Sequence, residues 1–147
     1  MSIARTGDTA FVAADTTRNE SVLRRSIEAW NANDWEALES LWNPDGSIVA
    51  PEGWPEPGPR EGWAAIRDQF ERIKDSWIEE RAEVLAVRSV GERLFAEIRW
   101  RMRGEASGAP LEVPMWMLCD FEGGRFSSIE YYLDLDAAQV AAERAER

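Results

Sequence analysis

The side chains that could carry out acid–base or nucleophilic chemistry in this sequence are Tyr131, Glu52, Asp120 and Cys119. Tyr131 is the best candidate, because a phenol can donate a hydrogen bond to a carbonyl group or act as a weak general acid. Glu52 is better explained as a solvated loop charge. Cys119 is better explained as an inert buried thiol, since nothing nearby in the sequence would lower its pKa. Any reaction would therefore depend on Tyr131 with a carboxylate such as Glu52 or Asp120.

The composition excludes several classes of protein. The chain has no histidine, so it can form no Ser-His-Asp triad, Cys-His dyad or histidine-containing metal site, and we expect no metal or cofactor. It carries 17 Lys and Arg against 28 Asp and Glu, a net charge of −11, which argues against nucleic acid and anionic membranes as partners. A lone cysteine and no recognisable signal peptide indicate a cytoplasmic protein.

Eight tryptophans are unusual for so acidic a chain, and helices and strands must position them. Residues 1–16 have few apolar side chains and are expected to form an N-terminal extension outside the core, of the kind that is often disordered. A capping-box spacing from Thr17 to Glu20 begins the first confident helix, and the apolar period of 3.6 predicts further helices. The expected helices are 17–33, 34–42, 62–77 and 136–147.

A period of two dominates the second half of the chain and predicts strands joined by short glycine turns. The strand candidates are 47–50, 79–90, 92–103, 111–122 and 125–134. Four prolines in 51–59 forbid helix and sheet interior, so this segment is expected to be a stiff loop that forms a lid or a pocket rim. The fold class is α+β: a curved antiparallel meander sheet wrapped around three N-terminal helices, with a short C-terminal helix, in one domain over residues 17–147.

This pattern, with several short segments, resembles the nuclear-transport-factor-2-like superfamily, in particular its SnoaL-like branch. The resemblance covers residues 17 to about 143. It implies a cone-shaped, cystatin-like fold that hosts isomerases, hydrolases, polyketide cyclases and non-enzymatic binders. The segments that carry it are Arg24 to Leu38 (RRSIEAWNANDWEAL), Asp45-Gly46-Ser47-Ile48, Arg60-Glu61-Gly62, Gly124-Arg125-Phe126 and Tyr132-Leu133-Asp134.

The positions at which relatives carry their chemistry are changed in this chain. The general-base aspartate of the steroid isomerases falls on Ala50, and their helix-one tyrosine falls on Ser26. The Arg and Asp of the epoxide hydrolases fall on Ile98 and Trp100, and the catalytic aspartate of the last strand falls on Tyr131. The resemblance therefore leaves open whether the protein is an enzyme.

Strand alternation predicts an aromatic and sulfur-rich wall inside the cone, which suits a hydrophobic or aromatic small molecule. The alternative is that these side chains are plain core and that Trp54 merely anchors its loop. The expected pocket residues are Trp30, Trp54, Trp63, Phe70, Ile98, Trp100, Val113, Met115, Met117, Cys119, Ile129 and Tyr131.

The opposite face of the sheet mixes charges with large apolar side chains, and we expect it to be covered in a homodimer. The residues of this expected dimer face are Arg99, Arg101, Glu112, Trp116, Leu118 and Tyr132. Three functions follow: a small-molecule binder, an isomerase-, cyclase- or hydrolase-like enzyme that uses Tyr131, and a dimeric protein-interaction module. A cone too full to hold a ligand would favour the third.

Overall fold

The structure is a computed structural model that describes residues 6–104 and 108–147. Its helices are α1 (Thr6–Ala32), α2 (Trp35–Ser40), α3 (Trp63–Asp75) and α4 (Leu135–Glu146). Its strands are β1 (Trp42–Ala50), β2 (Gly58–Glu61), β3 (Glu79–Val90), β4 (Arg93–Arg103), β5 (Pro110–Glu122) and β6 (Arg125–Tyr132).

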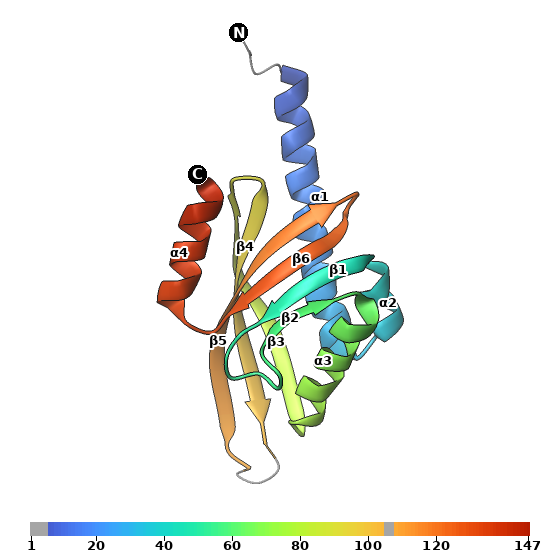
Figure 1. Ribbon diagram of the computed structural model, residues 1–147, viewed down its shortest axis with the longest axis vertical. Coiled ribbons are helices and arrows are strands. Elements are labelled where there is room, and N and C mark those ends of the chain that lie inside the picture. The colour runs from blue at the N-terminus through green and yellow to red at the C-terminus, as the bar shows by residue number, and fades with distance from the viewer. Residues whose placement is uncertain (1–5, 105–107) are drawn as a thin grey trace.

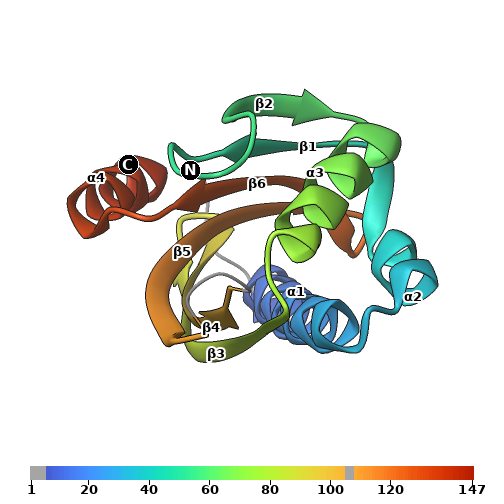
Figure 2. The same cartoon turned by 90° about the horizontal axis from the view of Figure 1, so that it is seen from below.

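The six strands form one curved, unclosed sheet in the order β2-β1-β6-β5-β4-β3. Seen from below, the sheet bends around α1, α2 and α3, while α4 lies outside the bend (Figure 2). Shifts of register within the β1–β6, β3–β4 and β5–β6 pairs accompany this curvature, as expected where an extra residue increases the local twist. The α+β class and the sheet wrapped around three N-terminal helices are confirmed.

The inner face of β4 follows the alternation expected from the sequence. Leu94, Ala96, Ile98, Trp100 and Met102 are all buried, and they join one core cluster with residues of α1 and α3. The concave side of the sheet is therefore the core side, and the cone lies between it and the helices.

The expected elements need three corrections. β1 begins at Trp42 instead of residue 47, and it pairs in parallel with β6, so the sheet is mixed and not a pure meander. The proline-rich stretch ends in β2, which includes Pro59 and pairs with β1 at the sheet edge, where a missing N–H is tolerated. α1 begins at Thr6 instead of Thr17, because no proline interrupts the chain between them.

The expected N-terminal extension lies only partly within the structure, because residues 1–5 are outside the described residues. The division into this extension and a domain over 17–147 stays a prediction. Although α1 has 27 residues, neither it nor any other helix among the described residues is long and apolar enough to cross a membrane.

The helix α4 covers part of the expected dimer face. Trp116 and Leu118 are buried in a second cluster with Ala138 and Ala142 of α4, whose small side chains let the helix approach the sheet. The structure pairs the charged members of the face within one chain. Homodimerisation stays a prediction. The apolar side chains on which it was based, Trp116 and Leu118, are covered by α4. The pairs are Arg99 to Glu112 at 3.0 Å, Arg101 to Glu112 at 3.5 Å, and the Tyr132 hydroxyl donating to Glu130 at 2.7 Å.

Gly91, in the turn between β3 and β4, offers a test of how α4 is seated. A Cβ atom at Gly91 would overlap the carbonyl oxygen of Ala145, whereas Gly123 has the same φ of 62° and open space around it. We expect Gly123→Ala to lower the free energy of unfolding by about 1–2 kcal/mol, because alanine is strained in the left-handed backbone conformation. Gly91→Ala should lower the free energy of unfolding by about 1–3 kcal/mol more than this, because α4 must move away from the new methyl group. Urea unfolding of both variants measures the difference, and equal losses would show that α4 is not held at this turn.

Candidate functional site

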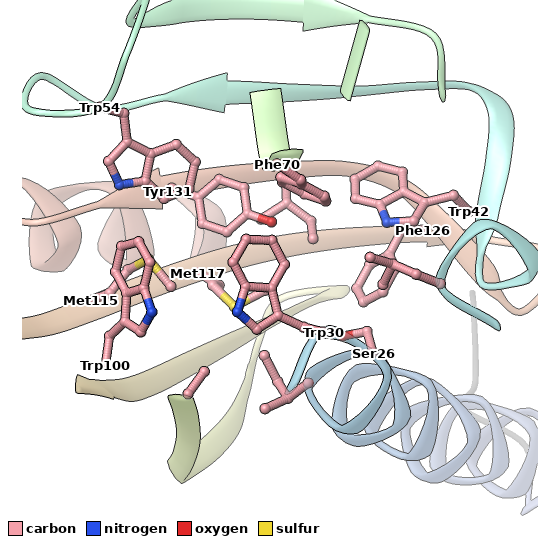
Figure 3. A pocket seen from close by; sticks show the side chains of 14 residues that line it. Ser26, Trp30, Trp42, Trp54, Phe70, Trp100, Met115, Met117, Phe126 and Tyr131 are labelled. Carbon is pink, nitrogen blue, oxygen red and sulfur yellow. The ribbon is translucent and has the colours of Figure 1, made fainter. Parts of the chain in front are cut away.

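The sheet and the first three helices enclose a cavity of about 50 Å³ whose wall is almost entirely apolar. Trp54, Trp100 and Met115 lie at one end of it, and Trp42 and Phe126 at the other (Figure 3). The ring of Trp30 packs edge-on against Phe70, with 5.2 Å between ring centroids. The lining residues are Ser26, Ile27, Trp30, Leu38, Trp42, Trp54, Phe70, Ala82, Trp100, Met115, Met117, Phe126, Ile129 and Tyr131.

The structure brings eight of the twelve expected pocket residues to this wall. They are Trp30, Trp54, Phe70, Trp100, Met115, Met117, Ile129 and Tyr131. The other four lie elsewhere. Ile98 and Cys119 are fully buried in the core, Trp63 packs against Trp42 at 6.5 Å between centroids, and Val113 lines a separate groove.

Six wall residues were not among the expected pocket residues, and of these Trp42 lies on a part of the fold that was missed, the early start of β1. Trp42 and Phe126 are paired in register because β1 starts early and runs parallel to β6. Ile27 lies on the expected apolar face of α1 together with Trp30, and Ser26 precedes it in the chain, while Leu38 of α2 and Ala82 of β3 also line the cavity. The apolar period could have identified Leu38. The parallel partner of β1 has no local signal.

Two unpaired hydrogen-bond donors face the cavity. The Tyr131 hydroxyl and the indole nitrogen of Trp42 point toward the space between the aromatic rings (Figure 3), and neither has a hydrogen-bond partner among the described residues. Ser26 donates its own hydrogen bond to the carbonyl of Leu23 at 2.6 Å, which leaves its oxygen free to accept. The polar groups on the wall can therefore orient a ligand that carries an oxygen acceptor.

Burial determines the protonation states in the wall. It raises the pKa of Tyr131 well above its usual value, so the phenol stays neutral and remains a donor. Burial, aided by the negative charge of Asp120, also raises the pKa of the Cys119 thiol. Cys119 is thus the inert thiol that the sequence indicated, because a nucleophile needs the thiolate.

A buried polar cluster beside the cavity centres on Glu80 of β3, a residue that was not expected at the site from the sequence. Its carboxylate accepts hydrogen bonds from the indole nitrogens of Trp30 and Trp100, the latter at 3.0 Å, and from the Lys74 ammonium at 2.6 Å. Lys74 also lies 4.1 Å from the centroid of the Trp30 ring, in cation–π geometry. The Glu80 and Lys74 side chains are only 8% and 10% exposed.

None of the hydrogen bonds in the described part of the chain joins Glu80, Glu52 or Asp120 to Tyr131. Three donors occupy Glu80, which leaves it suited to holding indoles and not to taking a proton from a ligand. Glu52 is exposed, while Asp120 accepts from Ser128 at 3.1 Å and pairs with Arg93 at 3.0 Å. Ala50 is buried at the end of β1, outside the cavity wall. Among residues 6–104 and 108–147, no cluster of His, Cys, Asp and Glu has the makings of a metal site.

Neighbouring residues on β3 provide a matched test of the Glu80 cluster. Glu80→Gln leaves the buried Lys74 ammonium without a counter-charge, and we expect a loss of about 3–5 kcal/mol of unfolding free energy. Glu79→Gln breaks an exposed pair with Arg103 and should cost less than about 1 kcal/mol. Adding Lys74→Met to Glu80→Gln should restore part of the loss. Similar urea midpoints for the two single variants would contradict the assignment.

The two tyrosines should titrate apart in the folded protein. Burial, together with the hydrogen bond to Glu130, raises the pKa of Tyr132 to about 12, and burial raises the pKa of Tyr131 well above its usual value. Both groups titrate near 10 in an unfolded chain. The stability that they contribute is therefore complete below about pH 10 and is lost as the pH rises through the folded values.

Tyrosinate absorbance against pH measures this directly. We expect one step at about pH 12 that disappears in Tyr132→Phe, while Tyr131 ionises only as the protein unfolds. A step near pH 10 in the folded Tyr132→Phe variant would show that Tyr131 is open to solvent.

Comparison with known proteins supports the fold. A comparison with curated proteins finds no match. Bal32a, from a soil-derived mobile gene cassette, is 23% identical with a TM-score of 0.74, and the alignment covers 90% of this chain and 99% of that one. TerC, co-crystallised with polyporic acid, is 19% identical with a TM-score of 0.71 over 86% and 98% of the two chains.

IdmH, a putative polyketide cyclase from Streptomyces antibioticus, is 21% identical with a TM-score of 0.69 over 84% of this chain and 96% of that one. At these identities the solved structures establish the fold alone. The family is shown by a different comparison, in which the SnoaL-like domain matches residues 23–129. This chain belongs to the SnoaL-like domain family.

Proposed function

We propose that this protein binds a small, flat, largely apolar molecule in the cone and orients it through an oxygen acceptor. The observation that carries the proposal is an aromatic wall with two unpaired donors, the hydroxyl of Tyr131 and the indole N–H of Trp42 (Figure 3). Apolar contact stabilises by about 25 cal/mol per Å² of buried surface, and one or two hydrogen bonds select the orientation. The TerC structure with polyporic acid supports the proposal, because a protein of this fold was crystallised with that small molecule.

The enzymatic alternative draws less support from the geometry. A cyclase or isomerase that uses Tyr131 needs a base within reach, since the neutral phenol can only donate a proton. Of the carboxylates first considered, Glu52 is exposed and Asp120 is paired with Arg93, while Glu80 is occupied by three donors. The finding that supports the cyclase alternative is the similar fold of IdmH, a putative polyketide cyclase.

The interaction-module alternative draws on the small volume of the cavity. At about 50 Å³ the cavity has room for a few waters, whereas ligand pockets measure roughly 300–1,000 Å³. Yet the surface proposed for that alternative is partly covered by α4, which buries Trp116 and Leu118. We therefore retain the binding function, and it requires that part of the wall move when a ligand enters.

A matched pair of flat molecules tests the function: 9-fluorenone, which has a carbonyl acceptor, and fluorene, which lacks it. Fluorenone should quench tryptophan fluorescence and raise the melting temperature, because its rings contact the indoles. Tyr131→Phe should weaken fluorenone binding by about five- to tenfold, the usual cost of one hydrogen bond, and leave fluorene binding unchanged. Absence of any shift with either compound would overturn the proposal.

A further inference from the structure

A second hollow lies directly beyond one end of the cavity. It is a groove of about 510 Å³ between the end of α3, the start of β5 and the segment 51–57. We call it the outer groove. Its apolar wall includes Ile73, Trp77, Leu111, Val113 and Leu133. Trp54 and Trp100 line both the outer groove and the cavity, so these two indoles are all that the two spaces share.

Trp54 is the part of this partition that lies on a loop. Its ring packs against Tyr131 at 4.7 Å and against Trp100 at 6.3 Å between centroids. Trp100, by contrast, is fixed in β4 and donates to Glu80. The indole nitrogen of Trp54 is buried and has no hydrogen-bond partner among the described residues. The closed position of Trp54 thus rests on ring packing and leaves a donor unused.

The side-chain hydrogen bonds and ion pairs that hold the segment 51–57 are made at Pro55 and Glu56, next to Trp54 and not to its side chain. Gln69 donates to the carbonyl of Pro55 at 2.5 Å, while its side-chain oxygen is buried and unpaired. Glu56 pairs with Arg60 at 2.9 Å and with Arg72 at 3.0 Å, and the half-exposed Glu56 and Arg72 stabilise weakly, while the less exposed Arg60 also donates to the carbonyl of Glu56 at 2.7 Å. Glu56 itself has a φ of 50°, which is strained for a residue other than glycine.

We propose that Trp54 is a movable wall and that the ligand site continues past it into the outer groove. The ligand is then a ring system that fills the cavity and carries an apolar chain or further ring that lies along the groove. This inference rests on the proposed function, and it names the class of ligand more closely. It accounts for the small closed cavity, because displacement of one side chain joins it to a groove large enough for most of a small molecule.

Two compounds with the same ring system distinguish binding in the outer groove from binding in the cavity. They are 9-fluorenone and 2-hexylfluoren-9-one, which adds an apolar chain. We expect the hexyl compound to bind at least about tenfold more tightly, because the outer groove covers its methylene groups. Leu111 is 49% exposed on the groove wall, so Leu111→Arg should fold. It should remove most of the advantage of the hexyl compound and leave the affinity for fluorenone unchanged. Leu85→Arg, at a 41% exposed position on β3 outside the groove, is the control and should change neither affinity.

Stopped-flow fluorescence tests the movement of the wall. Trp54→Ala should raise the association rate constant of both probes by about tenfold, because no side chain must be displaced, while Trp54→Phe should stay near the wild-type rate. Unchanged rates in Trp54→Ala, or an equal effect of Leu111→Arg on both probes, would overturn this proposal alone. If fluorenone itself fails to bind every variant, the proposed function is overturned as well.

Discussion

A single buried carboxylate joins the elements that form the cone. Glu80 of β3 accepts from Trp30 of α1, Lys74 near the end of α3 and Trp100 of β4, so four elements meet at one group. A charge with so little exposure is tolerated only where donors replace the water that it has lost. The cluster therefore fixes the positions of α1 and α3 on the sheet, because a shift of either helix along the sheet would break its hydrogen bond to Glu80.

These hydrogen bonds make two indole rings part of the apolar cavity wall. With their N–H groups bound to Glu80, Trp30 and Trp100 present ring carbons to the cavity, and the Lys74 ammonium is placed against the Trp30 ring. Trp42 and Tyr131, on the neighbouring strands β1 and β6, keep unpaired donors on the wall, and the indole nitrogen of Trp54 is unpaired as well. The apolar character of the cavity is thus a product of hydrogen bonding just behind it.

The sequence predicted the parts of this site that depend on local periodicity. Strand alternation is enough to place Met115, Met117 and Tyr131 on one side of the sheet, and these three line the cavity. It could not place Trp42 beside Phe126, because a parallel neighbour is chosen by the whole topology and not by a turn. Glu80 was missed because one glutamate in an exposed strand pattern looks solvated until a lysine from another element meets it. The closing helix was expected, but the face of the sheet that it covers is set by packing against Trp116 and Leu118.

The electrostatics of the cone restrict what it can hold. Burial disfavours the charged form of Tyr131, and it would disfavour a charged ligand for the same reason. An anion would lose its hydration water, and the described wall residues include no Lys or Arg that could replace it. A net charge of −11 adds a long-range repulsion toward anions. Lys74, the ammonium nearest the cavity, is already neutralised by Glu80 at 2.6 Å. A neutral molecule with a carbonyl-type acceptor meets neither penalty, and for it the aromatic wall and the two free donors are complementary.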